Sequence, residues 1–240
     1  EVIFMNSNNL SPRLKVVASL VPKGSKIADI GSDHAYLAIN LVRNQIATAA
    51  IAGEVAPGPL TNSKMEIEKN QVSDLIDARL GDGLTVLNPE DHVDVICVAG
   101  MGGLLIRRIL EEGQAKLSGV QRLVLQPNVG EYELREWLIT HGYQITHEDI
   151  VAEDYHLYEI IVAEPGQMQL TETELTFGPF LMQAANATFL RKWQRELKRL
   201  KSIQDNLERH PQHGGEKLAE VSKKIAQIEE MLTNVGETIN

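Results

Sequence analysis

Short apolar runs alternate with amphipathic segments along roughly the first two thirds of the chain. The runs predict strands near 26–30, 48–53, 75–80, 93–99 and 121–126. The segments between them predict helices near 34–44, 57–70, 102–112 and 130–141, after a short helix over 13–21 that Pro12 opens. This alternation is typical of a parallel sheet with helices on both faces.

Two further apolar runs, 143–151 and 156–164, have no helical segment between them. The residues at 152–155 have a turn-like composition, so the two runs predict an antiparallel pair at the end of the sheet. A seven-stranded sheet with this ending differs from a plain dinucleotide-binding fold and resembles that of class I methyltransferases. We therefore expect an α/β, Rossmann-like domain over residues 1–168.

Beyond about residue 171 the pattern changes to that of long helices. Apolar residues recur in steps of three and four over 190–207 and again over 218–235. The segment 210–215 contains proline and two glycines and separates the two arms. Heptad-like arms joined by a short breaker predict an antiparallel helical coiled-coil hairpin, which we assign to residues 169–240. The apolar stripe of each arm is interpreted as packing against the other arm.

The composition of the 240-residue chain, 43% hydrophobic and 23% charged, is that of an ordinary globular protein. No segment approaches the roughly 20 apolar residues of a membrane span, so we expect no membrane partner. The single cysteine, Cys97, lies in an apolar run and is expected to be buried in a strand. A chain without an internal disulfide fits a reduced, cytoplasmic setting. His210 and His213 lack the cysteine or carboxylate spacing of a metal site, so we expect no bound metal.

The net charge of −10 argues against a nucleic-acid partner when it is taken alone. The charge is unevenly distributed, however. Residues 1–170 carry 13 Lys and Arg against 23 Asp and Glu, whereas 171–240 carry ten of each kind. Within 191–209 there are seven basic residues and three acidic ones. Any basic surface therefore belongs to the helical part of the chain.

The turn after the first strand, ADIGSDHAYL, has one glycine where a dinucleotide-binding turn has three. Gly31 allows a sharp turn and the close approach of a ligand, and the helix that follows directs its free N–H groups toward the turn. Asp29 and Asp33 would repel a phosphate, so a ligand with a cationic centre and an amino group fits better. The alternative is that Ser32 or Asp33 only caps the helix.

Three further strand ends carry residues suited to a ligand. Glu54, 23 residues after Gly31, is placed to bind ribose hydroxyls or is an exposed strand-end charge. Asp82 lies between two glycines and is either an acceptor for an adenine amine or part of a β-turn. The exit AGMGG, which begins at Ala99, either leaves room for cofactor and substrate or packs the next helix closely.

The fifth strand ends in LQPN, with Gln126 and Asn128 on either side of a proline. A side-chain amide carries a donor and an acceptor together, which suits the edge of a nucleobase. A turn alone would also explain Pro127 and Asn128.

The segments ADIGSDHAYL, AGMGG, LQPN, HGY and EDYHLYEIIVAE resemble those of the bacterial tRNA (adenine-22-N1)-methyltransferases. The resemblance covers nearly all of the first domain and matches the helical tail in kind. It implies S-adenosylmethionine as the methyl donor, a D-loop adenine of tRNA as the acceptor, and a tail that helps to bind tRNA. With the strand-end arguments, it predicts cofactor contacts at Asp29, Gly31, Ser32, Asp33, Glu54, Asp82, Gly83, Gly100 and Met101.

Methylation at N1 needs no strong base, because N1 has a free lone pair, but the base must be unpaired or flipped out. We expect the target adenine to contact Asp33, His34, Tyr36 and Asn128. A basic face of the first tail helix is expected to meet tRNA phosphates through Arg191, Lys192, Arg195, Lys198 and Arg199. That face could instead be a solvated flank that pairs with acidic residues.

Two other functions remain open at this point. The same cofactor fold could act on another substrate, such as a small amine or a protein. Alternatively, the chain could be a non-catalytic adaptor that binds the cofactor and recruits a partner through its helical hairpin. The sequence identifies no protein partner.

Overall fold

A computed structural model of the chain describes residues 6–209 and 215–239, and the breaker histidines at 210 and 213 lie outside this range. The chain divides into two compact units, Glu1–Gln169 and Leu170–Asn240.

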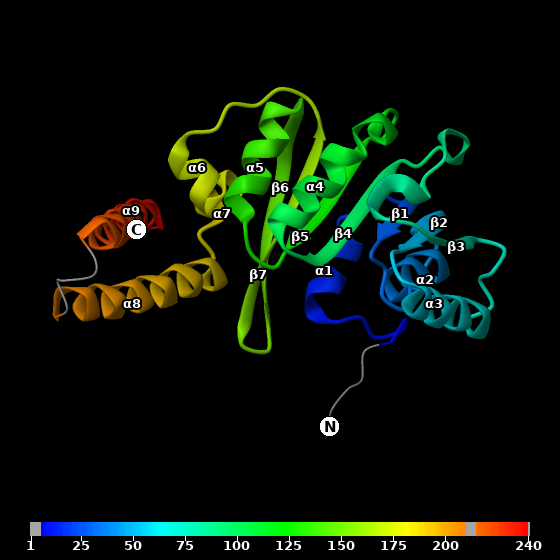
Figure 1. Cartoon of the computed structure of the whole chain (residues 1–240), viewed down its shortest axis with the longest axis horizontal. Coiled ribbons are helices and arrows are strands. Elements are labelled where there is room, and N and C mark those ends of the chain that lie inside the picture. The colour runs from blue at the N-terminus through cyan, green and yellow to red at the C-terminus, as the bar shows by residue number, and fades with distance from the viewer. Residues whose placement is uncertain (1–5, 210–214, 240) are drawn as a thin grey trace. The chain divides into compact units, whose positions relative to one another are not determined.

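The first unit is built on one seven-stranded sheet with the order β3-β2-β1-β4-β5-β7-β6 (Figure 1). The strands are β1 (Ser25–Ile30), β2 (Ala47–Glu54), β3 (Ile76–Leu80), β4 (Val95–Met101), β5 (Arg122–Pro127), β6 (Tyr143–Glu153) and β7 (His156–Pro165). The first five strands are parallel, and β7 is antiparallel to both β5 and β6. The predicted strands and their terminal antiparallel pair are confirmed.

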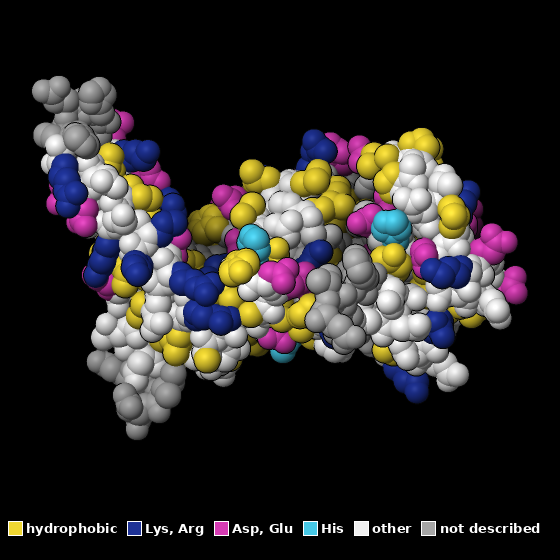
Figure 2. All heavy atoms as spheres, turned by 90° about the horizontal axis from the view of Figure 1, so that it is seen from below, with side chains coloured by type: hydrophobic (Ala, Val, Ile, Leu, Met, Phe, Trp, Pro, Cys, Tyr) yellow, Lys and Arg dark blue, Asp and Glu magenta, His cyan; other side chains and the backbone are white. Residues whose placement is uncertain are grey.

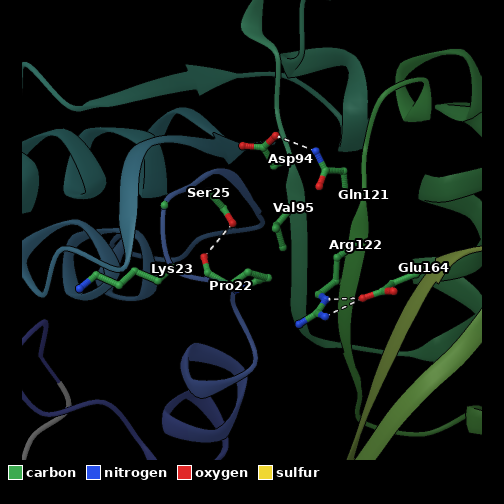
Figure 3. Close-up of a pocket in the computed structure, with 9 residues that line it drawn as sticks. Pro22, Lys23, Ser25, Asp94, Val95, Gln121, Arg122 and Glu164 are labelled. Atoms are coloured by element: carbon green, nitrogen blue, oxygen red, sulfur yellow. Dashed lines mark hydrogen bonds and ion pairs between the residues drawn. The ribbon is translucent and has the colours of Figure 1, made fainter.

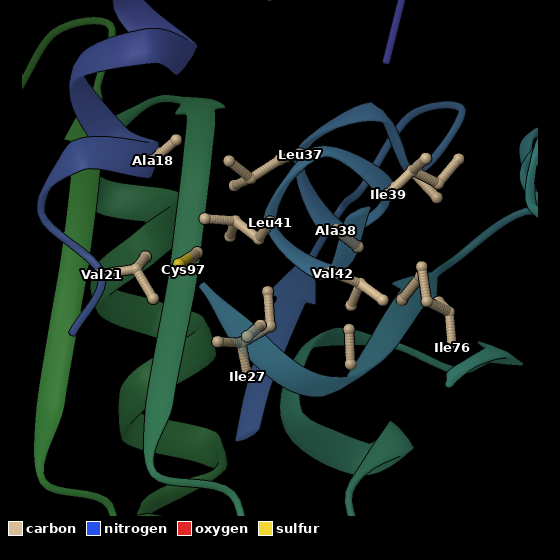
Figure 4. Packing of buried hydrophobic residues seen from close by; sticks show 14 of the residues in the cluster. Ala18, Val21, Ile27, Leu37, Ala38, Ile39, Leu41, Val42, Ile76 and Cys97 are labelled. Carbon is tan, nitrogen blue, oxygen red and sulfur yellow. The ribbon is translucent and has the colours of Figure 1, made fainter. Parts of the chain in front are cut away.

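Helices cover both faces of the sheet. Those of the first unit are α1 (Pro12–Ser19), α2 (Tyr36–Arg43), α3 (Pro57–Lys69), α4 (Gly103–Glu112) and α5 (Glu131–Thr140). Residues of α1, α2 and α3 share one buried cluster with alternate residues of the strands, among them Ile27 and Cys97 (Figure 4). Because successive strand residues point to opposite faces, the other residues of these strands pack beneath α4 and α5.

The burial of Cys97 is complete, which confirms its interpretation as a strand residue. Burial also raises the pKa of its thiol well above the ordinary value, so the reactive thiolate is disfavoured. α2 begins at Tyr36, two residues later than predicted, because Asp33, His34 and Ala35 all have positive φ values that a helix excludes.

A buried ionic cluster joins α5 to the terminal hairpin. The Arg135 guanidinium donates from Nε to Glu148 of β6 at 2.7 Å and from Nη2 to Glu159 of β7 at 2.5 Å. All three side chains are fully buried. Charged groups in an apolar interior need such partners, because an uncompensated buried charge costs several kcal/mol. The cluster therefore connects α5 to the β6–β7 hairpin through two direct hydrogen bonds of Arg135.

The second unit contains four helices within its described residues: α6 (Glu172–Phe177), α7 (Pro179–Ala184), α8 (Ala187–Arg209) and α9 (Gly215–Ile239). The two long arms are confirmed as packed helices, with Leu200, Val221, Ile225 and Ile228 buried. The short helices α6 and α7 were missed. Thr171 and Glu174 form a capping box at the start of α6, and Phe177 packs edge-on against Trp193 at 4.6 Å between ring centroids.

We predict that Arg135→Met lowers the free energy of unfolding by about 3–5 kcal/mol, because it removes the cation that both buried carboxylates contact. Urea denaturation at pH 7 measures this change. Lys69→Ala, which removes an exposed ion pair with Glu66 one turn away on α3, is the control and should cost less than about 0.5 kcal/mol. Equal losses for the two variants would contradict the prediction.

Candidate functional site

The carboxyl ends of β1, β2, β3 and β4 surround a cavity of about 220 Å³. Its lining consists of Ile30, Gly31, Gly53, Val55, Gly81, Asp82, Gly83, Met101, Leu105, Arg108 and Ile109. Four of the predicted cofactor residues, Gly31, Asp82, Gly83 and Met101, thus lie around one cavity. This position outside the carboxyl ends of parallel strands is where open α/β sheets bind ligands.

The absence of a side chain at Gly31 is required by its surroundings. Gly31 has a φ of +71°, and a Cβ built there would lie 2.1 Å from Cε of Met101. Any larger residue would have to displace Met101 and adopt a conformation that side chains disfavour. The one glycine of the first turn therefore lets the Met101 side chain pack directly against the backbone at the cavity.

Two buried carboxyl groups lie behind this turn. Oε1 of Glu54 accepts hydrogen bonds from Oγ of Ser32 at 3.1 Å and from the backbone N of Asp33 at 2.5 Å. Asp29 is 4% exposed, and its Oδ2 is buried without a hydrogen-bond partner among the described residues. Burial raises the pKa of Asp29 to about 8, and the Glu54 carboxylate adds to the rise. An orphaned oxygen of this kind calls for a donor that a ligand would bring.

The segment Asp33–Ala35 links this carboxyl pair to an aromatic pair. Its three residues have φ values of 36°, 68° and 56°, a run of left-handed conformations that stores strain. The His34 and Tyr36 rings stack at 5.2 Å with an interplanar angle of 9°, and Nε2 of His34 lies 3.7 Å from Oδ1 of Asp33. The Asp33 side chain is 76% exposed. Three of the four predicted adenine contacts therefore lie together.

The fourth, Asn128, belongs to a separate network at the ends of β4 and β5. Its Nδ2 donates to the carbonyl of Gly100 at 2.8 Å, and its Oδ1 accepts from Nε2 of Gln126 at 3.1 Å. Gln126 is fully buried, and its Oε1 accepts from the backbone N of Gly100 and from Nη1 of Arg13. Both polar atoms of the Gln126 amide therefore bind groups of the protein, and the prediction that this amide contacts the edge of a base is wrong.

The glycines of the AGMGG exit serve packing as well as space. A Cβ at Gly103 would lie 2.0 Å from the carbonyl oxygen of Gly130, so close backbone packing explains this glycine. A Cβ at Gly100 would lie 3.0 Å from Nη1 of Arg13. Gly100 therefore accommodates an arginine of α1, a role that the sequence did not indicate.

Arg13 is the main site residue that the sequence analysis missed. Besides Gln126, it contacts Glu153 of β6 through both its backbone N and its Nε, and its guanidinium lies 5.6 Å from the centroid of the Tyr158 ring. These partners are more than 100 positions away along the chain, so no local pattern could reveal the contact. Only the position of Arg13 at the start of a helix was visible.

The predicted tRNA-binding residues lie on α8 of the second unit. Arg191, Arg195, Lys198 and Arg199 are exposed, and Figure 2 shows Lys and Arg side chains along the helix pair. Arg199 forms an ion pair with Glu196 at 2.6 Å, and the Lys192 ammonium lies 5.3 Å from the centroid of the Trp193 ring. The basic face therefore reaches solvent, with part of its charge paired on the same helix.

A cavity of about 380 Å³ lies at the opposite edge of the sheet, where β1, β4 and β5 begin (Figure 3). Three of its charged groups are engaged by protein partners: Arg122 pairs with Glu164, and Asp94 accepts from the backbone N of Lys26. None of the predicted site residues lines it. We therefore assign the ligand site to the carboxyl edge, although the cavity there is smaller.

The carboxyl-edge site suits a ligand with three different parts. Val55, Leu105 and Ile109 supply apolar walls for a flat ring, and the exposed carboxylate of Asp82 can accept from an amine. Glu54 and Asp29 supply acceptors for hydroxyl and ammonium groups. The described residues contain no cluster of three metal-ligating side chains and no helix long and apolar enough to cross a membrane.

Comparison with known proteins gives consistent matches over nearly the whole chain. A sequence model of the tRNA (adenine(22)-N(1))-methyltransferase family matches residues 27–230. The tRNA (adenine(22)-N(1))-methyltransferase of Bacillus subtilis is 40% identical over 236 residues, which cover 95% of this chain and 99% of the relative.

Two solved structures extend this similarity to the fold. A Listeria monocytogenes protein of uncharacterized function superposes with a TM-score of 0.91 at 43% identity, covering 93% of this chain and 99% of its own. A Streptococcus pneumoniae protein in complex with S-adenosyl-L-methionine has a TM-score of 0.86 at 42% identity and covers 95% of this chain and 100% of its own.

The raised pKa of Asp29 leads to a pH-dependent prediction. The folded-state pKa of Asp29 is about 8, and its ordinary value is 3.8. Between these pH values Asp29 ionises in the unfolded chain but stays protonated in the folded protein, so the free energy of unfolding falls as the pH rises. Asp29→Asn removes this penalty. We predict that the stability of the variant relative to the wild type increases by about 2–4 kcal/mol between pH 5 and pH 9.

Urea denaturation of both proteins across this pH range measures the difference. Asp77→Asn, on an exposed carboxylate of β3, provides a control for the general effect of removing one acidic group. A stability difference for Asp29→Asn that does not change with pH would contradict the burial argument.

Proposed function

The chain belongs to the tRNA (adenine(22)-N(1))-methyltransferase family, and we propose from this premise which residues bind the cofactor, the adenine and the tRNA. The enzyme transfers a methyl group from S-adenosylmethionine to N1 of adenine 22 in tRNA. The observation that carries the residue assignment is the glycine-lined cavity at the carboxyl ends of β1 to β4, together with the buried Oδ2 of Asp29 in β1, which has no hydrogen-bond partner among the described residues.

The three parts of this site match three parts of S-adenosylmethionine. Asp29 and Ser32 receive its amino-acid end, because no described part of the chain supplies a donor for the buried Oδ2 of Asp29. Oε2 of Glu54 accepts from the ribose hydroxyls, since Oε1 already binds the first turn. The adenine ring lies against the apolar wall, with Asp82 accepting from its amine. Gly31, Asp33, Gly83, Gly100 and Met101 shape the rest of the pocket.

When bound, this cofactor supplies a methyl group on a sulfonium centre that a lone pair can attack. The protein's part of the reaction is to present N1 of adenine without its base-pairing partner, to exclude water and to stabilise the positive charge that the methylated base acquires. No general base is needed, because adenine N1 carries no proton at neutral pH. This requirement agrees with a site that contains carboxylates and amides rather than a nucleophile.

We assign the adenine side of the site to Asp33, His34, Tyr36 and Asn128. The exposed Asp33 carboxylate provides negative potential for the cationic product. His34 and Tyr36 already stack on each other, so a flipped adenine can extend that stack. Asn128 keeps one amide hydrogen available beyond its bond to Gly100 and can contact the base edge.

The second unit is proposed to bind tRNA through α8. The first unit is strongly acidic, so attraction of the tRNA backbone must come from a local basic surface. Arg191, Lys192, Arg195, Lys198 and Arg199 supply it. Processing of tRNA and the absence of a disulfide are consistent with a cytoplasmic enzyme.

The assigned activity predicts a specific product. Purified protein incubated with labelled S-adenosylmethionine and unmodified tRNA should transfer one methyl group per tRNA, and mapping should place it on N1 of adenine 22. A transcript with guanine at position 22 is the matched control and should accept none. Equal labelling of both transcripts would overturn the assignment of the target base.

If the α8 surface binds tRNA phosphates, reversing its charge should lower both the tRNA affinity and the dependence of that affinity on salt concentration. Reversing Arg191, Arg195 and Lys198 to Glu should weaken tRNA binding at least about tenfold at low salt and reduce its salt dependence, because phosphate contacts release counterions. Cofactor binding should not change. A filter-binding titration against salt concentration gives both quantities.

The matched control reverses Lys217, Lys223 and Lys224 on α9 to Glu, which changes the net charge by the same amount. If both triple variants weaken binding equally, the effect comes from overall charge and the assignment to α8 fails.

A further inference from the structure

The hairpin formed by β6 and β7 extends beyond the sheet at the edge where the site lies (Figure 1). β7 pairs with β5 only as far as Ile161, whereas its pairing with β6 continues to His156. β7 is antiparallel to β5, so this unsupported part projects past the carboxyl ends of the parallel strands. Continuing the register from Leu125 and Ile161 places Pro127, the last residue of β5, opposite Glu159. Residues 156–158 therefore lie past the end of β5 and, at about 3.3 Å each, give the hairpin a reach of roughly 10 Å.

One face of the projecting hairpin carries stacked flat groups. The rings of His156 and Tyr158 stack with centroids 5.6 Å apart and an interplanar angle of 17°. The Arg13 guanidinium lies over the Tyr158 ring, 5.6 Å from its centroid. His156 is exposed at the tip and Tyr158 is half-buried. We call Arg13, Tyr158 and His156 the hairpin ladder.

The hairpin ladder is held firmly at its inner end. Arg13 donates from Nη1 to Gln126 at 2.8 Å and from Nε to Glu153 at 3.2 Å, and the same oxygen of Gln126 accepts from the backbone N of Gly100. On the opposite face of β7, the next residue, Glu159, is anchored in the buried cluster with Arg135. The ladder thus starts at the strand exit that flanks the methyl-transfer site and runs outward on a rigid support.

Exposed aromatic rings beside a guanidinium are the surface on which unpaired nucleobases stack in single-stranded RNA recognition. When a target adenine flips out of the base stack, the bases next to it lose a stacking partner. The first unit is acidic, so contact near the site must rely on stacking more than on attraction of phosphates. No part of the reaction chemistry uses His156 or Tyr158.

We propose that the hairpin ladder binds the nucleotides adjacent to adenine 22 by stacking one of their unpaired bases on the His156–Tyr158 pair. Arg13 is a positioning residue that holds Tyr158 flat and links the ladder to Gly100. This inference rests on the proposed function, because it takes its ligand from the substrate of that site.

The test replaces the stacking faces and leaves the hydrogen bonds of Arg13 to Gln126 and Glu153 intact. His156→Ala and Tyr158→Leu should each raise KM for tRNA about tenfold with little change in kcat, and the dissociation constant for S-adenosylmethionine should not change. Tyr158→Phe keeps the ring and should behave as the wild type. His147→Ala, at an exposed histidine of the same hairpin far from the tip, is the matched control.

A fluorescent base reports stacking directly. tRNA with 2-aminopurine at position 21 or 23 should lose fluorescence when the wild-type protein binds one of these probes, because stacking quenches this base. The quenching should disappear with the His156→Ala, Tyr158→Leu double variant measured at saturating protein. The salt dependence of binding should stay that of the wild type, unlike the α8 variant.

The outcomes separate this inference from the proposed function. If the wild-type protein methylates adenine 22 but the ladder variants retain KM and quenching, the hairpin ladder does not bind the flanking bases. If Tyr158→Phe is as impaired as Tyr158→Leu, the role of Tyr158 is structural and the stacking proposal fails. If the wild-type protein does not methylate tRNA, the proposed function itself fails.

Discussion

The parallel pairing of β1 with β2 on one side and β4 on the other is the constraint on which the site depends. The chain leaves β1 toward one face of the sheet and leaves β4 toward the other, so α2 and α4 diverge from neighbouring strands. A crevice between these two exits follows from the connectivity alone. The side chains decide only what the crevice binds. Here Gly31 leaves room for Met101 in the lining of the cavity, and the carboxyl groups of Asp29 and Glu54 lie buried behind the first turn.

Two groups of buried charges in the first unit serve opposite purposes. Glu148 and Glu159 both contact Arg135, so the buried charges have direct partners and connect α5 to the hairpin. Asp29 lies beside another carboxyl group, and one of its oxygens has no partner within residues 6–209 and 215–239. That arrangement costs stability in the free protein, and a bound ammonium group would relieve it. A destabilising contact at one place is typical of a site that is completed by its ligand.

In the proposed function, the two units contribute to tRNA binding by different physical mechanisms. The proposed α8 surface would attract phosphate through unspecific, salt-dependent charge, which gives affinity without reading sequence. The hairpin ladder and the His34–Tyr36 pair offer flat faces that act only on unpaired bases. An acidic catalytic unit fits this division, because it repels backbone that is not held in the right place and favours a cationic product.

The fold could be predicted from the sequence because its signals are local. Apolar runs and helical spacing located all seven strands and the main helices, and the glycine turn after β1 and the strand-end carboxylates of Glu54 and Asp82 marked the edge where ligands bind. The strained start of α2 and the short helices α6 and α7 were missed, since positive φ values at Asp33 and Ala35 and six-residue helices leave little periodicity. The contacts of Arg13 with Gln126, Glu153 and Tyr158 join residues more than 100 positions apart. Such contacts depend on which strands become neighbours, so the sequence determined the kind of site, and only the tertiary structure decided which side chains face it.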